Sequence, residues 1–205
     1  MLGSALAGSD RPLVVTSGTG LIAPGRLATE DDMPASRSPS FPRISEQTAA
    51  SLAAHGVRAC VVRLPQVHDR AKQGLVSYMI AVAGQKGVSA YAGDGLNRWP
   101  AVHRLDAAPL YRLALEKGSA GARYHAVAEE GVPMREIAEA IGRGLKVPVV
   151  SKTPEEAAQH FGFLGFFVGA DCPASSAQTQ QRLGWRPTTQ PGLIADLDHA
   201  SAFGA

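Results

Sequence analysis

The sequence has 205 residues, of which 45% are hydrophobic and 19% are charged. This composition supports a buried core and excludes a chain that is disordered throughout. The net charge of +2 comes from lysines and arginines that are scattered along the chain, so it argues against a nucleic-acid-binding protein. No apolar stretch approaches the roughly 20 residues of a membrane-spanning helix, so we expect neither a nucleic acid nor a membrane as a partner.

Cysteine and histidine usage predicts neither a disulfide framework nor a metal site. Cys60 and Cys172 have no C-x-x-C partner, and Cys60 lies in an apolar run where a small buried side chain is expected. His68 and His103 are predicted to be structural, and the remaining histidines lack ligand spacing. The first ten residues do not read as a signal peptide. A reduced, cytoplasmic setting is therefore expected.

Two short apolar runs frame the first part of the chain, and each is closed by a glycine or a proline. Residues 13–17 and residues 58–64 are accordingly predicted to be buried strands. The stretch 23–42 is rich in Pro, Ser and charged residues without a period, so it is predicted to be a long loop. A helix is predicted over residues 46–55, closed by Gly56.

The rest of the chain continues this alternation of strands and helices. Asp106 is expected to cap one helix, and Pro133 is expected to open another. The predicted helices cover residues 75–83, 106–116 and 133–143, and the predicted strands cover 99–103, 124–128 and 147–150. Short helical pieces are predicted in the tail at 154 onward, 161–168, 174–183 and after Pro191. The alternation predicts an α/β fold in which strands 13–17, 58–64 and 124–128 share one parallel sheet, covered by helices from 46, 106 and 133.

Three segments resemble, in order, parts of one protein family. Residues 14–18, Val-Val-Thr-Ser-Gly, resemble the strand that carries the catalytic Ser/Thr of extended short-chain dehydrogenases/reductases. Residues 61–68 resemble the next strand and its loop under the nicotinamide, and residues 93–108 resemble the substrate-lobe motif. Weaker matches follow at residues 124–127, 133–137 and 183–187. Over nearly its whole length, the chain resembles the C-terminal portion of an atypical member of this family, which includes the NAD-dependent epimerases/dehydratases.

The resemblance implies a partial Rossmann-like parallel sheet with helices and a small C-terminal substrate lobe. Residues 1–70, interleaved with residues 98–130, would form the C-terminal half of an NAD(P)-binding domain, and residues 71–205 would mostly form the lobe. A Rossmann fold binds pyrophosphate at a glycine-rich turn after its first strand. That turn is not found in this sequence, so we expect a truncated chain that binds NAD or NADP weakly or not at all.

The resemblance also implies a set of site residues at the ends of the two strands and in the lobe. Ser17 would be catalytic, while Thr16, Pro65, Gln66 and Val67 would bind the cofactor, and Thr19 and Arg98 would bind the substrate. Structural alternatives stay open: Ser17 could satisfy a turn, Pro65 to Val67 could be an ordinary strand exit, and Arg98 could form a surface ion pair. If the residues converge on one cleft, it would suit a small polar compound with a hydroxyl or carbonyl near Ser17 and an anionic or polar group near Arg98.

The usual proton-transfer pair of the family, a Tyr followed four residues later by a Lys, is not found. The residues four positions after the four tyrosines are Val82, Gly95, Leu115 and Ala128. The resemblance places Ser38 and Pro42 at the two positions of the pair. Three functions therefore remain open: an NAD(P)-linked oxidoreductase or epimerase, a non-catalytic NAD(P)-binding sensor, and an inactive gene fragment. The oligomeric state is not predicted.

Overall fold

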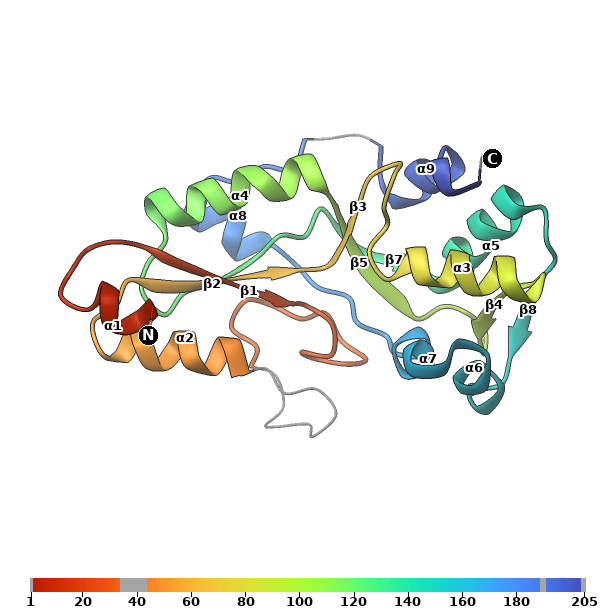
Figure 1. Ribbon diagram of the computed structural model, residues 1–205, viewed down its shortest axis with the longest axis horizontal. Helices are drawn as coiled ribbons and strands as arrows, with labels where there is room; N and C mark the ends of the chain where they lie inside the picture. Colours follow the sequence, from red (N-terminus) through yellow and green to blue (C-terminus); the bar gives the residue numbers. More distant parts are fainter. Residues whose placement is uncertain (1, 34–43, 189–190, 204–205) are drawn as a thin grey trace.

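The computed structural model describes residues 2–33, 44–188 and 191–203. Figure 1 shows two groups of elements at the two ends of the longest axis, with β3, β5 and β7 between them. Each group has its own cluster of buried apolar residues, and a third, small cluster joins Ile22, Ala23 and Ala28 to Val127 and Ala174. Each cluster draws on segments that lie far apart in the sequence. The chain therefore passes between the two groups several times.

The first group is built on a parallel sheet with the strand order β1-β2-β6. These strands are β1 (Leu13–Gly18), β2 (Ala59–Leu64) and β6 (Arg123–His125). The first five residues of β2 are all buried, as expected for a central strand that is covered on both faces. The predicted pairing of the two apolar runs is confirmed, since β1 and β2 are direct parallel neighbours. The third predicted strand is also present but ends at His125.

Helices cover both faces of this sheet. Figure 1 shows α2 (Ile44–Ala54) and α4 (Arg104–Lys117) on opposite sides of β1 and β2. Both were predicted from sequence, but the cap of α4 was predicted wrongly. His103 is the N-cap, because its Nδ1 atom accepts the backbone N–H of Leu105 at 3.2 Å. Asp106 instead lies buried in the first turn and accepts the backbone N–H of Thr188 at 3.0 Å.

The three central strands form a small mixed sheet with the order β3-β5-β7. They are β3 (Gln66–His68), β5 (Arg98–His103) and β7 (Glu129–Pro133). β3 follows β2 after Pro65 and runs parallel to β5, whereas β5 and β7 are antiparallel. After β2 ends, the chain passes through this sheet, as β3, and continues into the second group.

The helix predicted from residue 133 lies in the second group, so its expected packing on the first sheet is wrong. α5 (Met134–Leu145) packs against α3 (Val76–Lys86), α9 (Leu193–Asp198) and β4 (Ser89–Ala92). The physical reason is that β7 pairs with β5, which directs the chain away from β6 before α5 begins. The periodicity of α5 correctly indicates an apolar face, including Ile137 and Ile141, but periodicity does not specify which sheet covers that face.

The second group encloses the larger apolar cluster. Its elements include α3 (Val76–Lys86), β4 (Ser89–Ala92), β8 (Val149–Lys152), α6 (Pro154–Phe161), η1 (Gly162–Leu164), α7 (Gly165–Val168), α9 (Leu193–Asp198) and η2 (Ser201–Phe203). β4 and β8 form a two-stranded parallel sheet. The remaining elements, α1 (Leu2–Leu6) and α8 (Ala177–Leu183), lie in the first group (Figure 1). None of the helices described is long and apolar enough to cross a membrane.

The cluster of the first group includes the predicted buried cysteine. Cys60 is 2% exposed, and its thiol faces the carbonyl of Ala114 in α4 at 3.9 Å. Burial raises the pKa of the Cys60 thiol to about 11, so the thiol stays protonated. A protonated, buried thiol is a packing group and not a nucleophile.

Candidate functional site

The carboxyl ends of β1 and β2 lie side by side, which is where open α/β sheets place their ligands. Gly18 is opposite Leu64 in the register of the two strands. The chain after β1 stays attached to β2, because the backbone N–H of Thr19 donates to the Leu64 carbonyl at 3.0 Å. Thr19 is only 2% exposed, and its hydroxyl lies 3.5 Å from the same carbonyl. Thr19 therefore has a structural role in addition to any contact with a ligand.

Thr16 and Ser17 point to opposite faces of β1, since successive side chains of a strand alternate. The hydroxyl of Thr16 lies 2.7 Å from the phenol oxygen of Tyr111, so Thr16 faces α4. Ser17 is half-buried and faces the side of α2. Burial raises the pKa of Tyr111, more than its hydrogen bond with Thr16 lowers it, so the phenol is protonated at neutral pH. Only Ser17, of these two, faces the side on which α2 begins.

Pro65, Gln66 and Val67 make the passage from β2 to β3. The side-chain oxygen of Gln66 accepts the backbone N–H of Leu75 at 3.0 Å, just before α3 begins. Val67 is paired with Val102 of β5. A Cβ atom at Gly74 would come within 2.8 Å of the Gln66 side-chain oxygen, so the glycine permits this close approach. Gln66 thus fixes the start of α3, a role that the sequence did not predict.

Arg98 lies at the start of β5 and forms a fork-shaped ion pair with Asp171. Its Nε atom donates to Oδ1 at 3.0 Å and its Nη2 atom donates to Oδ2 at 2.9 Å. The backbone N–H of Arg98 also donates to Oδ1, at 2.8 Å. The side chains are 43% and 25% exposed. The hydrogen bonds from Arg98 lower the pKa of Asp171, so the carboxylate is ionised at neutral pH.

The loop after β1 connects the strand ends to this ion pair. The backbone N–H of Gly25 donates to the carbonyl of Asp171 at 2.8 Å, and that of Ala28 donates to Pro173 at 2.9 Å. Ala28 and Ala174 form an isolated parallel bridge. The segments that carry Thr19 and Arg98 are therefore joined through one loop, whereas convergence of all the predicted residues on one cleft stays a prediction.

A buried polar network beneath the strand ends was missed by the sequence reasoning. Arg63 is completely buried, and its Nε and Nη2 atoms donate to the carboxylate of Glu46 at 3.0 and 2.8 Å. Its Nη1 atom donates to the carbonyl of Asp32 at 2.9 Å and lies 3.2 Å from Nε2 of His125. An arginine inside an apolar strand is the signal for such a network, because a buried charge requires a partner.

His125 takes part in this network as a neutral ring. Burial lowers the pKa of His125, and the nearby charge of Arg63 lowers it further, against the opposite effect of Glu30. Its Nδ1 atom lies 2.8 Å from the carbonyl of Ser175, so Nδ1 carries the proton and Nε2 accepts from Arg63. The network therefore holds β2, β6 and the segment before α8 together.

A second buried cluster joins the C-terminal helix to the central sheet. Nδ1 of His68 lies 2.8 Å from Oδ2 of Asp196 in α9, and both side chains are 1% exposed. Nε2 of His68 is 3.7 Å from Glu129, and Nε2 of His103 is 3.7 Å from Asp196. Glu129 also accepts the backbone N–H of Leu193 at 2.8 Å. These contacts give His68 and His103 a structural role in attaching α9.

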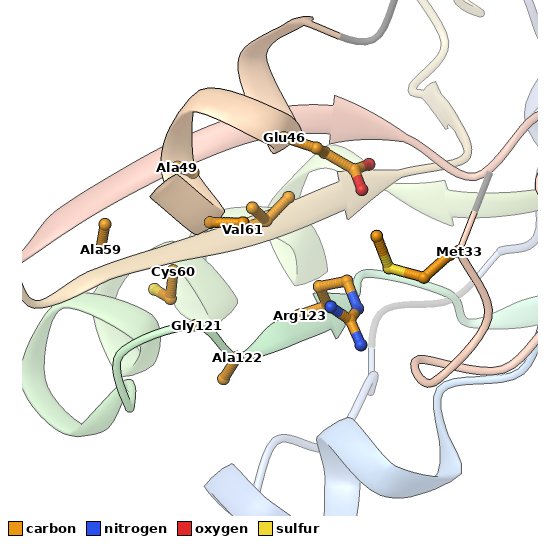
Figure 2. Close-up of a pocket in the computed structure, with 10 residues that line it drawn as sticks. Met33, Glu46, Ala49, Ala59, Cys60, Val61, Gly121, Ala122 and Arg123 are labelled. Atoms are coloured by element: carbon orange, nitrogen blue, oxygen red, sulfur yellow. The ribbon is translucent and has the colours of Figure 1, made fainter. Parts of the chain in front are cut away.

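Figure 2 shows the residues around a hollow between α2 and the neighbouring strands β2 and β6. The hollow has a volume of about 20 Å³, which is room for roughly one water molecule. It is lined by Met33, Glu46, Val61 and Arg123, among others. This hollow is too small for a substrate. Among the described residues, no three His, Cys, Asp or Glu side chains are grouped so that they could bind a metal ion.

Solved structures define the class of fold. The chain superposes with a TM-score of 0.69 on dTDP-glucose 4,6-dehydratase DesIV from Streptomyces venezuelae, solved with NAD and TYD, at 19% identity over 91% of this chain and 58% of that one. UDP-glucose 4-epimerase from Thermus thermophilus, in complex with NAD, gives 0.68 at 20% identity, over 95% and 65%. MoeE5 with UDP-glucuronic acid and NAD gives 0.68 at 16% identity, over 98% and 68%. The α/β fold with its parallel sheet is therefore the Rossmann-like fold of these structures.

Sequence comparison defines the family more closely, although no family model matches the chain. The chain is 52% identical over 206 residues to the uncharacterized protein C2A9.02 of Schizosaccharomyces pombe. The aligned region covers 98% of this chain and 68% of that protein. It is 45% identical over 193 residues to the uncharacterized protein YLL056C of Saccharomyces cerevisiae, covering 94% and 64%. The chain belongs to the family of these two fungal proteins, and it spans about two thirds of their lengths.

Proposed function

We propose that this chain forms the nicotinamide and substrate side of an NAD(P)-binding oxidoreductase or epimerase-like protein of the short-chain dehydrogenase/reductase superfamily. The observation that carries the proposal is the junction of β1 and β2, where Ser17, Thr19 and Pro65 meet at adjacent strand ends. Open α/β sheets bind ligands at this edge. Support also comes from three neighbours of the same fold that were solved with NAD.

The proposed division of the chain into a cofactor-binding domain and a substrate lobe follows the apolar clusters of the two groups. Residues 1–70 together with 98–130 would belong to the NAD(P)-binding domain, and 71–205 mostly to the substrate lobe. The first cluster contains Val62, Val102 and Tyr124, in agreement with this division. It also contains Trp185, so α8 and the residues after it are assigned to the cofactor side in spite of their position in the sequence. The lobe would then consist mainly of α3, α5, α6, α7 and α9.

We assign residues of this chain to one end of a dinucleotide. Thr16, Ser17 and the segment 65–67 would line the nicotinamide end, which accepts or donates a hydride when the cofactor is bound. A pyrophosphate cradle joins a strand directly to the N-terminus of a helix. Gly18 is the last residue of β1 and Gly20 follows it, but the described residues after them, 21–33, contain no helix, and the next helix described, α2, begins at Ile44. The pyrophosphate is therefore not assigned to residues of this chain.

Ser17 is proposed to hydrogen-bond a hydroxyl or carbonyl of a small polar substrate. Ser38 and Pro42, which the resemblance places at the positions of the Tyr–Lys pair, lie outside the described residues. With no such pair in the sequence, proton transfer would depend on another group or on water. Positioned acid–base catalysis contributes roughly 10²–10⁴-fold, so turnover would be slow. This feature favours a second candidate function, a non-catalytic NAD(P)-binding sensor.

The test is a fluorescence and calorimetric titration of NADH and NADPH into two purified proteins, this chain and the fission-yeast relative. We expect the longer relative to bind at micromolar concentrations and this chain to bind very weakly or not at all, because its sequence lacks a glycine-rich turn. If the relative does not bind either dinucleotide at about 1 mM, the proposal is wrong. Micromolar binding by this chain alone would instead show that its cofactor site lies elsewhere. Hydride transfer by the relative then separates the enzyme from the sensor.

A further inference from the structure

The cationic fork of Arg98 is already occupied by a carboxylate of the same chain. An arginine binds a phosphate through two parallel N–H groups, and in Arg98 two such groups point at Asp171. The hydrogen bonds raise the pKa of Arg98 and lower that of Asp171, so both members of the pair are charged. Together the two side chains present no net charge to a substrate.

Backbone hydrogen bonds fix the positions of both residues, so the ion pair does not depend on the conformation of two surface side chains alone. The backbone N–H of Cys172 donates to the Arg98 carbonyl at 2.8 Å, and that of Gly25 donates to the Asp171 carbonyl at 2.8 Å. A Cβ atom at Gly131 would come within 2.9 Å of the Cβ atom of Arg98, so the glycine leaves room for the arginine to lie across β7. Both partners are therefore positioned by neighbouring segments.

The other arginines on the segments around the strand ends also have a carboxylate within 4 Å, although Arg70 lies 3.9 Å from Asp196 without a hydrogen bond. In the described part of the chain, every arginine on the loop after β1, on β2, on the loop after β3 and at the start of α4 has a carboxylate partner. These pairs are Arg26 with Asp32, Arg63 with Glu46, Arg70 with Asp196 and Arg104 with Asp69. Lys72 is exposed on the loop after β3, where its flexible side chain contributes a solvated charge and not a fixed fork.

We propose that Asp171 is a specificity-determining residue that blocks Arg98 as an anion-binding group, so that the substrate is an uncharged hydroxyl- or carbonyl-bearing compound and not a phosphorylated one. This inference rests on the proposed function for the location of the substrate. Of the anionic or polar group that was expected near Arg98, it retains the polar alternative and excludes the anionic one. It also sets this chain apart from neighbours of the same fold that were solved with UDP-glucuronic acid or TYD.

The experiment is a calorimetric titration of uridine diphosphate, without a dinucleotide, into the wild-type chain and into Asp171→Asn. At an ionic strength of about 0.01 M, charges are screened only beyond roughly 30 Å. We expect no saturation of the wild type at about 1 mM. We expect D171N to bind at least about tenfold more tightly, because a freed guanidinium gains charge-assisted hydrogen bonds to the phosphates. The double variant R98Q/D171N should lose this gain.

The matched control is Asp198→Asn, which breaks the exposed pair between Arg143 and Asp198, whose Nη2 and Oδ1 atoms are 2.7 Å apart. D198N should not gain affinity for uridine diphosphate. Circular dichroism verifies folding, and Asp171→Ser replaces D171N if that variant is unfolded. Tight wild-type binding that R98Q abolishes, or a folded D171N or D171S that gains nothing, would overturn the inference. Because the titration omits NAD(P), a failure of the proposed cofactor function leaves this readout unchanged.

Discussion

At the scale of single residues, the buried charge of Arg63 requires partners elsewhere in the sequence. Arg63 is fully buried in the middle of the fold, and its three nitrogen atoms are all hydrogen-bonded. Removing one member of such a pair leaves the other charge buried without compensation, which costs more than the pair contributes. The carboxylate of Glu46 and the neutral ring of His125 are therefore both needed for Arg63 to remain inside the sheet.

Replacing Glu46 with Ala is expected to lower the free energy of unfolding by about 3–5 kcal/mol, because Arg63 would keep its charge without a carboxylate. Urea denaturation followed by circular dichroism measures the change. The matched control is Glu116→Ala, which breaks the exposed pair with Arg112 on α4 and should change the free energy of unfolding by less than about 1 kcal/mol. Equal effects of the two substitutions would contradict the assigned role of Glu46.

The stability of the chain should fall as the pH is lowered from about 7 to about 5. His125 has a folded-state pKa below its ordinary value of 6.5, so the unfolded chain takes up more protons than the folded chain as the pH falls through this window. Stability is then present above the unfolded pKa and is lost as the pH falls below it, by up to about 1.4 kcal/mol per pH unit. Denaturation at several pH values measures the slope.

Two variants assign this slope to its source. His125→Gln should flatten the dependence between pH 7 and pH 5. The pKa of His160 is also lowered, by burial and by two lysines, so His160→Gln is the control. The pH dependence of stability should be steeper in His160→Gln than in His125→Gln. The ionised carboxylates, including Asp171 and Glu129, have lowered pKa values and act at more acidic pH. A wild-type stability that does not change over this window would contradict the buried neutral state of His125.

At the scale of elements, side-chain contacts decide where each helix is attached. α9 has only six residues and is too short to be stable alone. Its position comes from Asp196, which contacts His68, and from Glu129, which accepts the first backbone N–H of the helix. Burial would raise the pKa of Glu129, but the contacts with His68 and Leu193 outweigh burial and lower it. The ionised carboxylate at the helix N-terminus is also favoured by the helix dipole.

Asp196→Ala is expected to loosen α9 without unfolding the first sheet. Amide hydrogen exchange should become faster in residues 193–203, while β1, β2 and β6 keep their protection, because locally opening units are independent of distant ones. Mass spectrometry of peptides after exchange measures both regions in one sample. Asp198→Ala, on the exposed side of the same helix, should leave the exchange of residues 193–203 close to that of the wild type. Uniform acceleration across the chain would contradict a local role for Asp196.

At the scale of the whole molecule, local patterns predicted the elements and the first sheet, and distant contacts account for what they missed. The apolar run of β2 sufficed because a strand buried on both faces is continuously hydrophobic. The run of β1 also predicted a strand, but β1 is only half-buried and Thr16 is exposed, so the expectation that residues 13–17 are buried is wrong. The packing of α5 was not predictable, because its amphipathic pattern does not name a partner. Arg98 was recognised as a candidate, but Asp171 lies 73 positions later, and nothing in the local sequence links the two. The buried Arg63 could have been found from its apolar neighbours.

The return of α8 to the first group affects the order in which the chain can fold during synthesis. Trp185 is 2% exposed in the cluster of the first sheet, and its indole N–H donates to the Asp106 carbonyl at 3.0 Å. Ribosomes deliver the chain from its N-terminus, and domains commonly fold as they emerge. The apolar cluster on the sheet made by residues 13–125 would then stay incomplete and exposed to solvent until residue 185 has left the exit tunnel. Nascent chains that stall before this point should depend on chaperones more than released ones.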